Sequence, residues 1–313
     1  MERYDRLKQI QRMDPERDFH RMYQLIATHE FPWDFSRSLE LALFRTYAVP
    51  SIGALLARTA EFGTRAQKRY DDTALLLDAV VEHGFDDERG RTAIRRINQM
   101  HRSYAISNDD MRYVLCTFVV MPKRWIDRYG WRRLTDVELR ACVGYYRHLG
   151  RHMGIQQIPV TFEEFEECLD SYEAEHFGWD EGGHEVAEST LALMASWYPR
   201  ALRPAVRAAS TALLDEPLRR AFRYPEPAFA LRAAVDGALR LRGRLVRLMP
   251  PRRVPRFGRQ NREIKGYRQG YRLADLGTFP VPGLKWCPVD HAGRPPAAVT
   301  ASGAEKPSEP SVE

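Results

Sequence analysis

Cysteine is scarce in this sequence, and its spacing argues against a disulfide scaffold or a zinc fold. The chain of 313 residues has four cysteines, Cys116, Cys142, Cys168 and Cys287, which form neither a CxxC pair nor a zinc-like cluster. Three of them fall inside helical patterns. We therefore expect reduced thiols in the core of a protein from a reducing compartment.

Long apolar runs are missing as well. The longest apolar region, Leu39–Ala57, contains Glu40, Arg45 and Pro50, so it is a poor candidate for a membrane span. Residues 1–19 are charged throughout and lack the apolar segment of a signal peptide. We expect a cytoplasmic protein, with attachment to a membrane surface left open.

Familiar motifs for nucleophilic catalysis and nucleotide binding are also absent. The sequence has no GxSxG elbow to present a nucleophile, and no GxGxxG or Walker loop to hold phosphates. No serine or cysteine stands in a recognisable catalytic setting. Hydrolysis through a covalent intermediate therefore has no support in the sequence.

Strand signals are scarce, and helical periodicity runs through most of the chain. No alternating runs of valine, isoleucine and threonine stand between Asn-Gly or Asp-Gly turns. Capping boxes at Thr135–Glu138 and Thr161–Glu164 predict two helix starts. With no internal repeat, we predict an all-α single domain over residues 1–285. The tail, 286–313, is rich in proline, alanine, serine and glutamate, and we expect it to be disordered.

Prolines, glycines and small polar residues mark the expected helix ends. Ser36 is expected to cap a helix that Pro50 later interrupts. Gly84 is expected to close the helix Arg65–His83, because glycine readily adopts the left-handed conformation at such ends. The pair Gly182-Gly183 is expected to separate two later helices.

The chain is organised around the stretch Arg89–Met121. In its first half Ile94, Ile97, His101 and Tyr104 recur three or four residues apart, so they share one face of a helix. A lone histidine on an apolar face more often finds a hydrogen-bond partner in the core than it serves as a ligand. From the residues alone, both fates remain open for His101.

The second half of this stretch predicts a buried helix. Ser107 and Asn108 are good N-caps, and the run Met111–Met121 is apolar nearly all round, which is typical of a helix inside a protein. Pro122 is expected to stop this helix. His101 is therefore expected to face a buried neighbour.

Positive charge is concentrated late in the chain. The formal net charge is +6 at pH 7, but the arginine-rich segment 219–272 is opposed only by Glu226, Asp236 and Glu263. Three interpretations remain open: a solvated basic face, an amphipathic helix on anionic lipid, or a nucleic-acid surface. No DNA- or RNA-reading module accompanies the charge, so we expect no nucleic-acid partner and keep peripheral membrane contact as a candidate.

Two Glu-x-x-His pairs have the spacing of metal ligands. Glu173 with His176, and Glu181 with His184, each place a carboxylate and an imidazole one helical turn apart. A di-iron bundle needs such pairs on two separate helices, with further glutamates from two others. Here the pairs lie only eight residues apart. A non-haem di-iron oxidase is therefore a weaker alternative.

A resemblance favours the ligand role for His101. The run His101–Leu115 (HRSYAISNDDMRYVL) resembles the signature of the MpaB-type oxygenases, which belong with the rubber-cleaving latex clearing proteins in one haem-dependent superfamily. Further matches are Thr59–Phe62, Arg69–Thr73, 122–130 and 267–277. The resemblance covers roughly residues 49–277, which is most of the predicted domain.

The resemblance implies a helical, globin-like fold that encloses haem b, with His101 as the proximal iron ligand. Ile97, Tyr104 and Arg69 are then expected to contact the cofactor. Arg69 and Thr73 occupy the positions of an arginine and a threonine in the rubber-cleaving relatives, one helical turn apart, and are implied to be catalytic. The alternative for Arg69 is a surface ion pair with one of the two aspartates that follow it.

One position departs from the relatives' pattern. They carry a lysine directly before the threonine, where this chain has Asp72, which we also assign to the catalytic set. Glu61 is a positional guess for their distal glutamate.

We predict a haem b oxygenase that uses O2 to cleave a C=C bond in an apolar isoprenoid or lipid-like substrate. The alternative is a haem-binding protein without turnover, such as a carrier or gas sensor.

Overall fold

The computed structural model describes residues 2–267 and 269–278 of the chain. Within these residues it consists of α-helices with short 3₁₀ and π turns and has no strand, so the predicted all-α class is confirmed. The predicted boundary at residue 285 and the tail 286–313 lie outside the described residues.

The helices follow one another with short connections. They are α1 (Asp5–Ile10), α2 (Phe19–Leu25), α3 (Pro32–Thr46), α4 (Pro50–Arg58), α5 (Glu61–His83), α6 (Glu88–His101), α7 (Asn108–Tyr129), α8 (Asp136–His152), α9 (Phe162–His176), α10 (Glu181–Ser196), α11 (Arg203–Ala212), α12 (Glu216–Ala221) and α13 (Phe229–Leu248).

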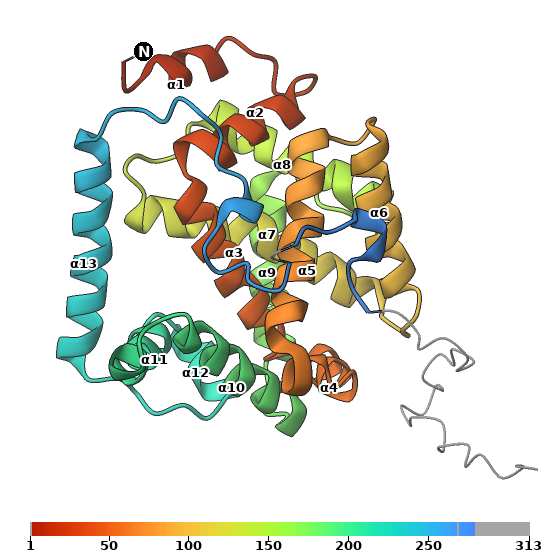
Figure 1. The fold of residues 1–313 in the computed structure, drawn as a ribbon, viewed down its shortest axis with the longest axis vertical. Coiled ribbons are helices and arrows are strands. Elements are labelled where there is room, and N and C mark those ends of the chain that lie inside the picture. Colours follow the sequence, from red (N-terminus) through yellow and green to blue (C-terminus); the bar gives the residue numbers. More distant parts are fainter. Residues whose placement is uncertain (1, 268, 279–313) are drawn as a thin grey trace, which may run out of the picture.

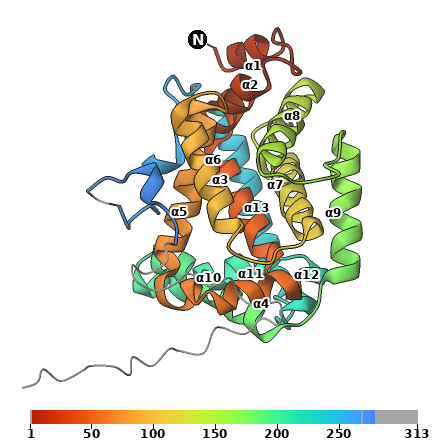
Figure 2. The same ribbon diagram turned by 90° about the vertical axis from the view of Figure 1, so that its right-hand side faces the viewer.

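The helix α7 occupies the centre, with α3, α8 and α9 packed around it (Figures 1 and 2). The helices α5 and α6 lie side by side next to this group, and α4, α10, α11 and α12 form a layer at one end. A main hydrophobic core surrounds α7, and a smaller core joins the end of α3 to α10 and α12. The long helix α13 runs along one side of the molecule.

The central helix is longer than its sequence predicted. Its N-terminus is capped as expected, because the Ser107 hydroxyl accepts a hydrogen bond from the Asp110 amide at 2.9 Å. The prediction that Pro122 ends the helix was wrong: Pro122 is buried inside α7, which continues to Tyr129. A proline in a helix interior costs about 3 kcal/mol. Burial of Trp125 and Ile126 beyond it offsets that cost.

Two other expected helix ends also differ from the structure. Helix α3 begins at Pro32, in the first-turn position that proline favours, so Ser36 lies inside the helix and does not cap it. Gly182 and Gly183 lie in the first turn of α10, whose cap is the carboxylate of Asp180. Their role is close packing, since a Cβ on Gly183 would lie 2.4 Å from the Tyr47 carbonyl oxygen.

The predicted caps elsewhere hold, except that the capping box predicted at Thr161 is only partly formed. Thr135 and Glu138 form a complete capping box at the start of α8. At α9 the Thr161 hydroxyl caps as expected, while the Glu164 carboxylate accepts from the amide of Val160. Gly84 ends α5 with a φ of 80°.

Among the described residues, no single helix has the length and apolar character needed to cross a bilayer. Within residues 2–267 and 269–278, one pair of helices, α3 and α4, meets that test when taken together, and the two are bent by 96° at their junction.

Candidate functional site

The pairing of α5 with α6 brings Arg69 near the ring of His101. His101 is the last residue of α6, and burial together with the nearby positive charge of Arg69 lowers its pKa to about 4. Burial disfavours the imidazolium because a charge loses its hydration there. The imidazole of His101 is therefore neutral at neutral pH.

The hydrogen bonding of His101 is incomplete. Its Nδ1 atom is buried and has no partner among the described residues. Such atoms are uncommon in folded proteins, because an unmade buried hydrogen bond costs about 1–3 kcal/mol. A neutral imidazole with a free ring nitrogen is the form in which histidine binds a metal, so His101 fits the role of an iron ligand.

Arg69 and Thr73 contact each other, as their spacing predicts. The Arg69 guanidinium donates a hydrogen bond to the Thr73 hydroxyl, which in turn donates to the Arg69 carbonyl at 3.0 Å. The expected alternative, an ion pair with a neighbouring aspartate, is not found in the described part of the chain. Asp71 accepts from the amides of Lys265 and Gly266, at 3.1 and 2.6 Å. The positive charge of Arg69 is therefore not neutralised by an ion pair with a described aspartate.

Tyr104 and Glu61 join this cluster. Burial raises the pKa of Tyr104, with the negative charge of Glu61 acting in the same direction and Arg69 against it. Glu61 is buried in the first turn of α5. That turn is unusual, since Ala60 before it has a left-handed φ of 57° and Arg65 breaks the helix with φ −137°. Non-glycine residues rarely adopt a positive φ, and such strain gathers at functional sites.

Ile97 lies one turn before His101 on α6 and is buried in the main core. Asp72 is placed elsewhere. It pairs with Lys68 at 2.6 Å and accepts a hydrogen bond from the hydroxyl of Tyr267. Asp72 therefore faces the segment that contains Tyr267. The structure brings His101, Arg69, Tyr104 and Glu61 together, whereas Asp72 belongs to a separate contact and its catalytic role stays a prediction.

Two aromatic residues beside Arg69 were missed by sequence reasoning. The Arg69 guanidinium lies 5.8 Å from the ring centre of Phe62, which in turn lies 5.5 Å from the ring of Tyr47. Phe62 falls within the run Thr59–Phe62 that carried the resemblance. Tyr47 had no comparable signal, since it stands at the junction of α3 and α4.

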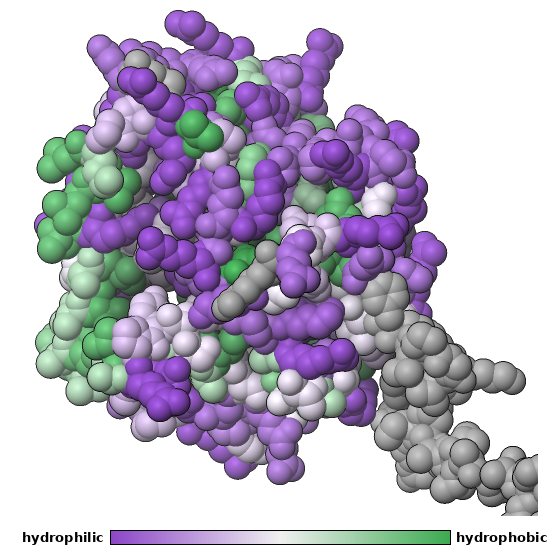
Figure 3. All heavy atoms as spheres, viewed as in Figure 1, coloured by the Kyte–Doolittle hydropathy of each residue, from purple (hydrophilic) through white to green (hydrophobic). Residues whose placement is uncertain are grey.

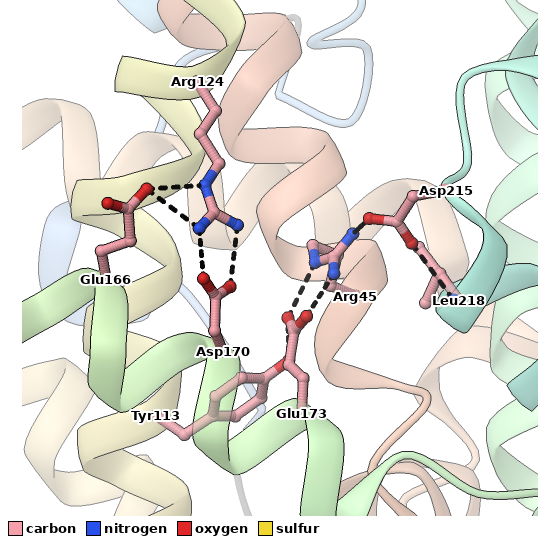
Figure 4. Close-up of polar contacts among 8 residues, drawn as sticks. All are labelled: Arg45, Tyr113, Arg124, Glu166, Asp170, Glu173, Asp215 and Leu218. Atoms are coloured by element: carbon pink, nitrogen blue, oxygen red, sulfur yellow. Dashed lines mark hydrogen bonds and ion pairs between the residues drawn. The ribbon is translucent and has the colours of Figure 1, made fainter.

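The alternative di-iron site is contradicted by the partners of Glu173. Both oxygens of its carboxylate accept hydrogen bonds from Arg45, and the Tyr113 hydroxyl adds a third at 3.1 Å (Figure 4). Arg45 also reaches Asp215, which caps α12. Within residues 2–267 and 269–278, no group of three or more histidine, cysteine or acidic side chains is arranged to hold a metal ion.

The histidines of the two Glu-x-x-His pairs are also placed in aromatic surroundings. His176 uses Nδ1 in a 3.1 Å contact with the Tyr172 carbonyl, and its ring stacks on that of Tyr172 with centres 4.0 Å apart. His184 lies between the rings of Trp179 and Tyr224. Among the described residues, neither histidine belongs to a group of three or more potential metal-binding side chains.

Two surface clefts lie away from this cluster. One, of about 600 Å³, lies between α5, α6 and residues 271–274. The other, of about 670 Å³, lies between α12, α13 and the end of α7. Neither is lined by His101 or Arg69, whose helices α6 and α5 pack against each other.

Comparison with known proteins agrees with the sequence signature. Residues 38–248 match the family described as ER-bound oxygenase mpaB/B'/Rubber oxygenase, catalytic domain. The chain is 32% identical over 246 residues to the ER-bound oxygenase mpaB' of Penicillium brevicompactum, an alignment that covers 72% of this chain but only 58% of that relative. It is 30% identical over 254 residues to the ER-bound oxygenase mpaB of Penicillium roqueforti (strain FM164), covering 72% of this chain and 85% of the relative. This chain therefore belongs to the MpaB and rubber oxygenase catalytic-domain family.

Proposed function

We propose that this protein is a haem b-dependent oxygenase that cleaves a C=C bond in an apolar isoprenoid or lipid-like chain. Its relatives are named oxygenases, which supports an enzyme that uses O2. The observation that carries the proposal is His101: a neutral imidazole with an unpartnered Nδ1 among the described residues, next to Arg69.

His101 would hold the haem iron, and it is suited to do so because a neutral imidazole has one unprotonated ring nitrogen that can bind a metal. Ile97 would supply part of the apolar wall against the porphyrin. Haem b, when bound, supplies the iron that reacts with dioxygen. The chain itself would supply the neutral ligand.

The charged groups around His101 would have distinct roles. Arg69, held by the Thr73 hydroxyl, presents a fixed positive charge that suits a haem propionate or negative charge developing in the reaction. Tyr104 keeps its hydroxyl proton, because burial raises its pKa, and can donate it as a hydrogen bond. Glu61, which pairs with Arg65, is the carboxylate whose charge acts on Tyr104.

An absorption spectrum with hemin tests the cofactor. The protein is purified, reconstituted with hemin and freed of excess by gel filtration. We expect a Soret band that migrates with the protein at one haem per chain. A colourless protein after reconstitution would refute the haem assignment.

Oxygen uptake then tests the reaction. Consumption of O2 in the presence of a polyprenyl chain, with carbonyl products detected by mass spectrometry, is expected for an oxygenase that cleaves C=C bonds. A protein that binds hemin stoichiometrically but consumes no O2 with such chains would be a carrier or sensor.

A further inference from the structure

The outer face of α13 is an unbroken apolar stripe. Gly243 is the buried residue of this helix, and a Cβ there would lie 2.5 Å from the Tyr129 carbonyl, so this side packs closely on the end of α7. Leu239 and Val246 flank Gly243 and contact the main core. Residues on the opposite side are all apolar and exposed; they are Ala230, Ala234, Gly237, Ala238, Leu241, Leu245 and Leu248.

The larger members of this stripe are well exposed. Leu241 is 54% exposed, Leu245 is 55% exposed and Leu248 is 83% exposed. Further exposed apolar residues extend the surface at both ends; they are Phe229, Met249 and Val254. Figure 3 shows hydrophobic residues along the edge of the molecule where α13 runs in Figure 1. Contiguous apolar surface of this kind marks a site of contact with a partner or a membrane.

A row of arginines borders the stripe on one side. Arg240, Arg244 and Arg247 each precede one residue of the leucine row, with the same spacing of four and three residues, so the two rows run side by side along the helix. Arg240 pairs with Asp236 at 2.9 Å, and Asp236 is the only acid of α13.

The remaining arginines of this face have no such neighbour. Arg244 and Arg247 are exposed and form no ion pair or hydrogen bond with the described residues, and the same holds for Arg253 beyond the helix. An apolar row beside unneutralised arginines complements the boundary between headgroups and acyl chains in an anionic bilayer. At 1.5 Å per residue, the 20 residues of α13 provide a contact line of roughly 30 Å.

We propose that the outer face of α13, with the turn that follows it, docks the protein on the surface of an anionic lipid bilayer. The leucine row enters the boundary with the acyl chains, and the guanidinium groups of Arg244, Arg247 and Arg253 contact lipid phosphates. The contact is made by the side of the helix that points away from the protein, so it requires no unfolding. It goes beyond the proposed function and does not depend on haem.

Sedimentation with vesicles tests this surface. The full chain is mixed with vesicles of phosphatidylcholine alone, or of phosphatidylcholine with phosphatidylserine, at low and high salt. We expect retention by the phosphatidylserine vesicles at low salt and a weaker retention at high salt. Equal retention by both kinds of vesicle, or by neither, would overturn the proposal.

Paired variants assign the contact to the two rows. Leu241→Ser with Leu245→Ser is expected to weaken vesicle binding roughly a hundredfold, since two partly inserted leucines are lost. The matched control is Val160→Ser, at a residue that is also 54% exposed but lies before α9, and it should bind like the wild type. Far-UV circular dichroism checks that each variant is folded. Unchanged binding by the folded double leucine variant would overturn the assignment.

Arg244→Gln with Arg247→Gln is expected to weaken binding to anionic vesicles roughly twentyfold. Its control is Arg240→Gln, which removes an arginine that is already paired with Asp236.

Light scattering gives the oligomeric state. If the protein is a dimer that the leucine variants dissociate, and vesicles do not retain it, the stripe binds a second copy and the lipid assignment is overturned. Vesicle binding by a colourless preparation would support the surface even if haem binding failed.

Discussion

Two histidines in this protein each have a ring nitrogen without a hydrogen-bond partner among the described residues, but their surroundings differ. Both His101 and His184 have a buried Nδ1 atom with no partner among the described residues. The ring of His101 ends α6 beside the charged guanidinium of Arg69. The ring of His184 lies between Trp179 and Tyr224 in the first turn of α10.

Among the described residues, His184 belongs to no group of three or more histidine, cysteine or acidic side chains that could hold a metal ion. Glu173, in the neighbouring α9, is held by Arg45 in a buried ion pair that links α3 to α9 (Figure 4). Arg124 ties α7 to the same helix through Glu166 and Asp170. The comparison teaches that ligand spacing is not enough: a carboxylate whose charge is already neutralised by a buried arginine is held in place by that arginine and is a poor metal ligand.

The sharpest test of this difference is the loss of one imidazole. His101→Ala is expected to abolish the Soret band of the reconstituted protein, because no other ring would hold the iron. His184→Ala is the matched control, since it removes a histidine with the same orphan nitrogen, and it should keep the band. If His101→Ala retains a full band, the ligand is elsewhere, with His83, His148 and His152 as the next candidates.

The second test separates fold stability from cofactor binding. Glu173→Ala leaves Arg45 buried without its main partner, and we expect a loss of about 3–5 kcal/mol in the free energy of unfolding. Urea denaturation measures this loss, and the folded fraction should still bind hemin fully.

A compensating variant sharpens that result. Arg45→Met together with Glu173→Leu removes both charges and should be less destabilised than Glu173→Ala alone. Loss of hemin from folded Glu173→Ala would mean that the α9–α10 junction takes part in cofactor binding.

The third test concerns the charge beside His101. Arg69→Leu is expected to lower the rate of oxygen uptake about a hundredfold, the usual effect of removing one fixed group that stabilises developing charge. Hemin binding should persist, although the position of the Soret band should shift. Arg69→Lys keeps the charge and should recover part of the rate. A fully active Arg69→Leu enzyme would assign Arg69 to structure alone.

The smallest expected effect is on stability against pH in the haem-free protein. The pKa of His101 is about 4 in the folded state, below the ordinary value of 6.5, so the unfolded chain binds this proton first as pH falls. The stability due to neutral His101 is complete above pH 6.5 and declines between pH 6.5 and about 4. His101→Leu should reduce this decline, measured by urea midpoints. The pKa of His29 is also lowered to about 4, so His29 should cause part of the decline in both the wild type and the His101→Leu variant.

Features set within one helical turn were predictable from the sequence. The Ser107 cap, the capping box at Thr135 and the contact of Arg69 with Thr73 each join residues no more than four apart. The family signature, a continuous run of the chain, also pointed to His101. These features follow from the fixed geometry of a helix and from local sequence, neither of which depends on the rest of the fold.

Features that join distant segments could not be predicted. Arg45 and Glu173 are 128 residues apart, and Asp72 and Tyr267 are 195 apart. The sequence shows Asp72 next to Thr73 but does not show that α5 turns it toward the end of the described chain. The prediction for Pro122 failed for the same reason, since burial on both sides of the proline outweighs its local cost.

The sequence by itself determined the all-α class and the family, and it pointed to His101 as the histidine that we propose holds iron, because helix periodicity and a long motif are local properties. Only the tertiary structure decided which charges are free. It pairs Glu173 with Arg45, leaves Arg69 beside His101, and turns the leucines of α13 outward by seating Gly243 on α7. The physical reason is that burial and ion pairing depend on which surfaces meet, and that is settled by the packing of the whole chain.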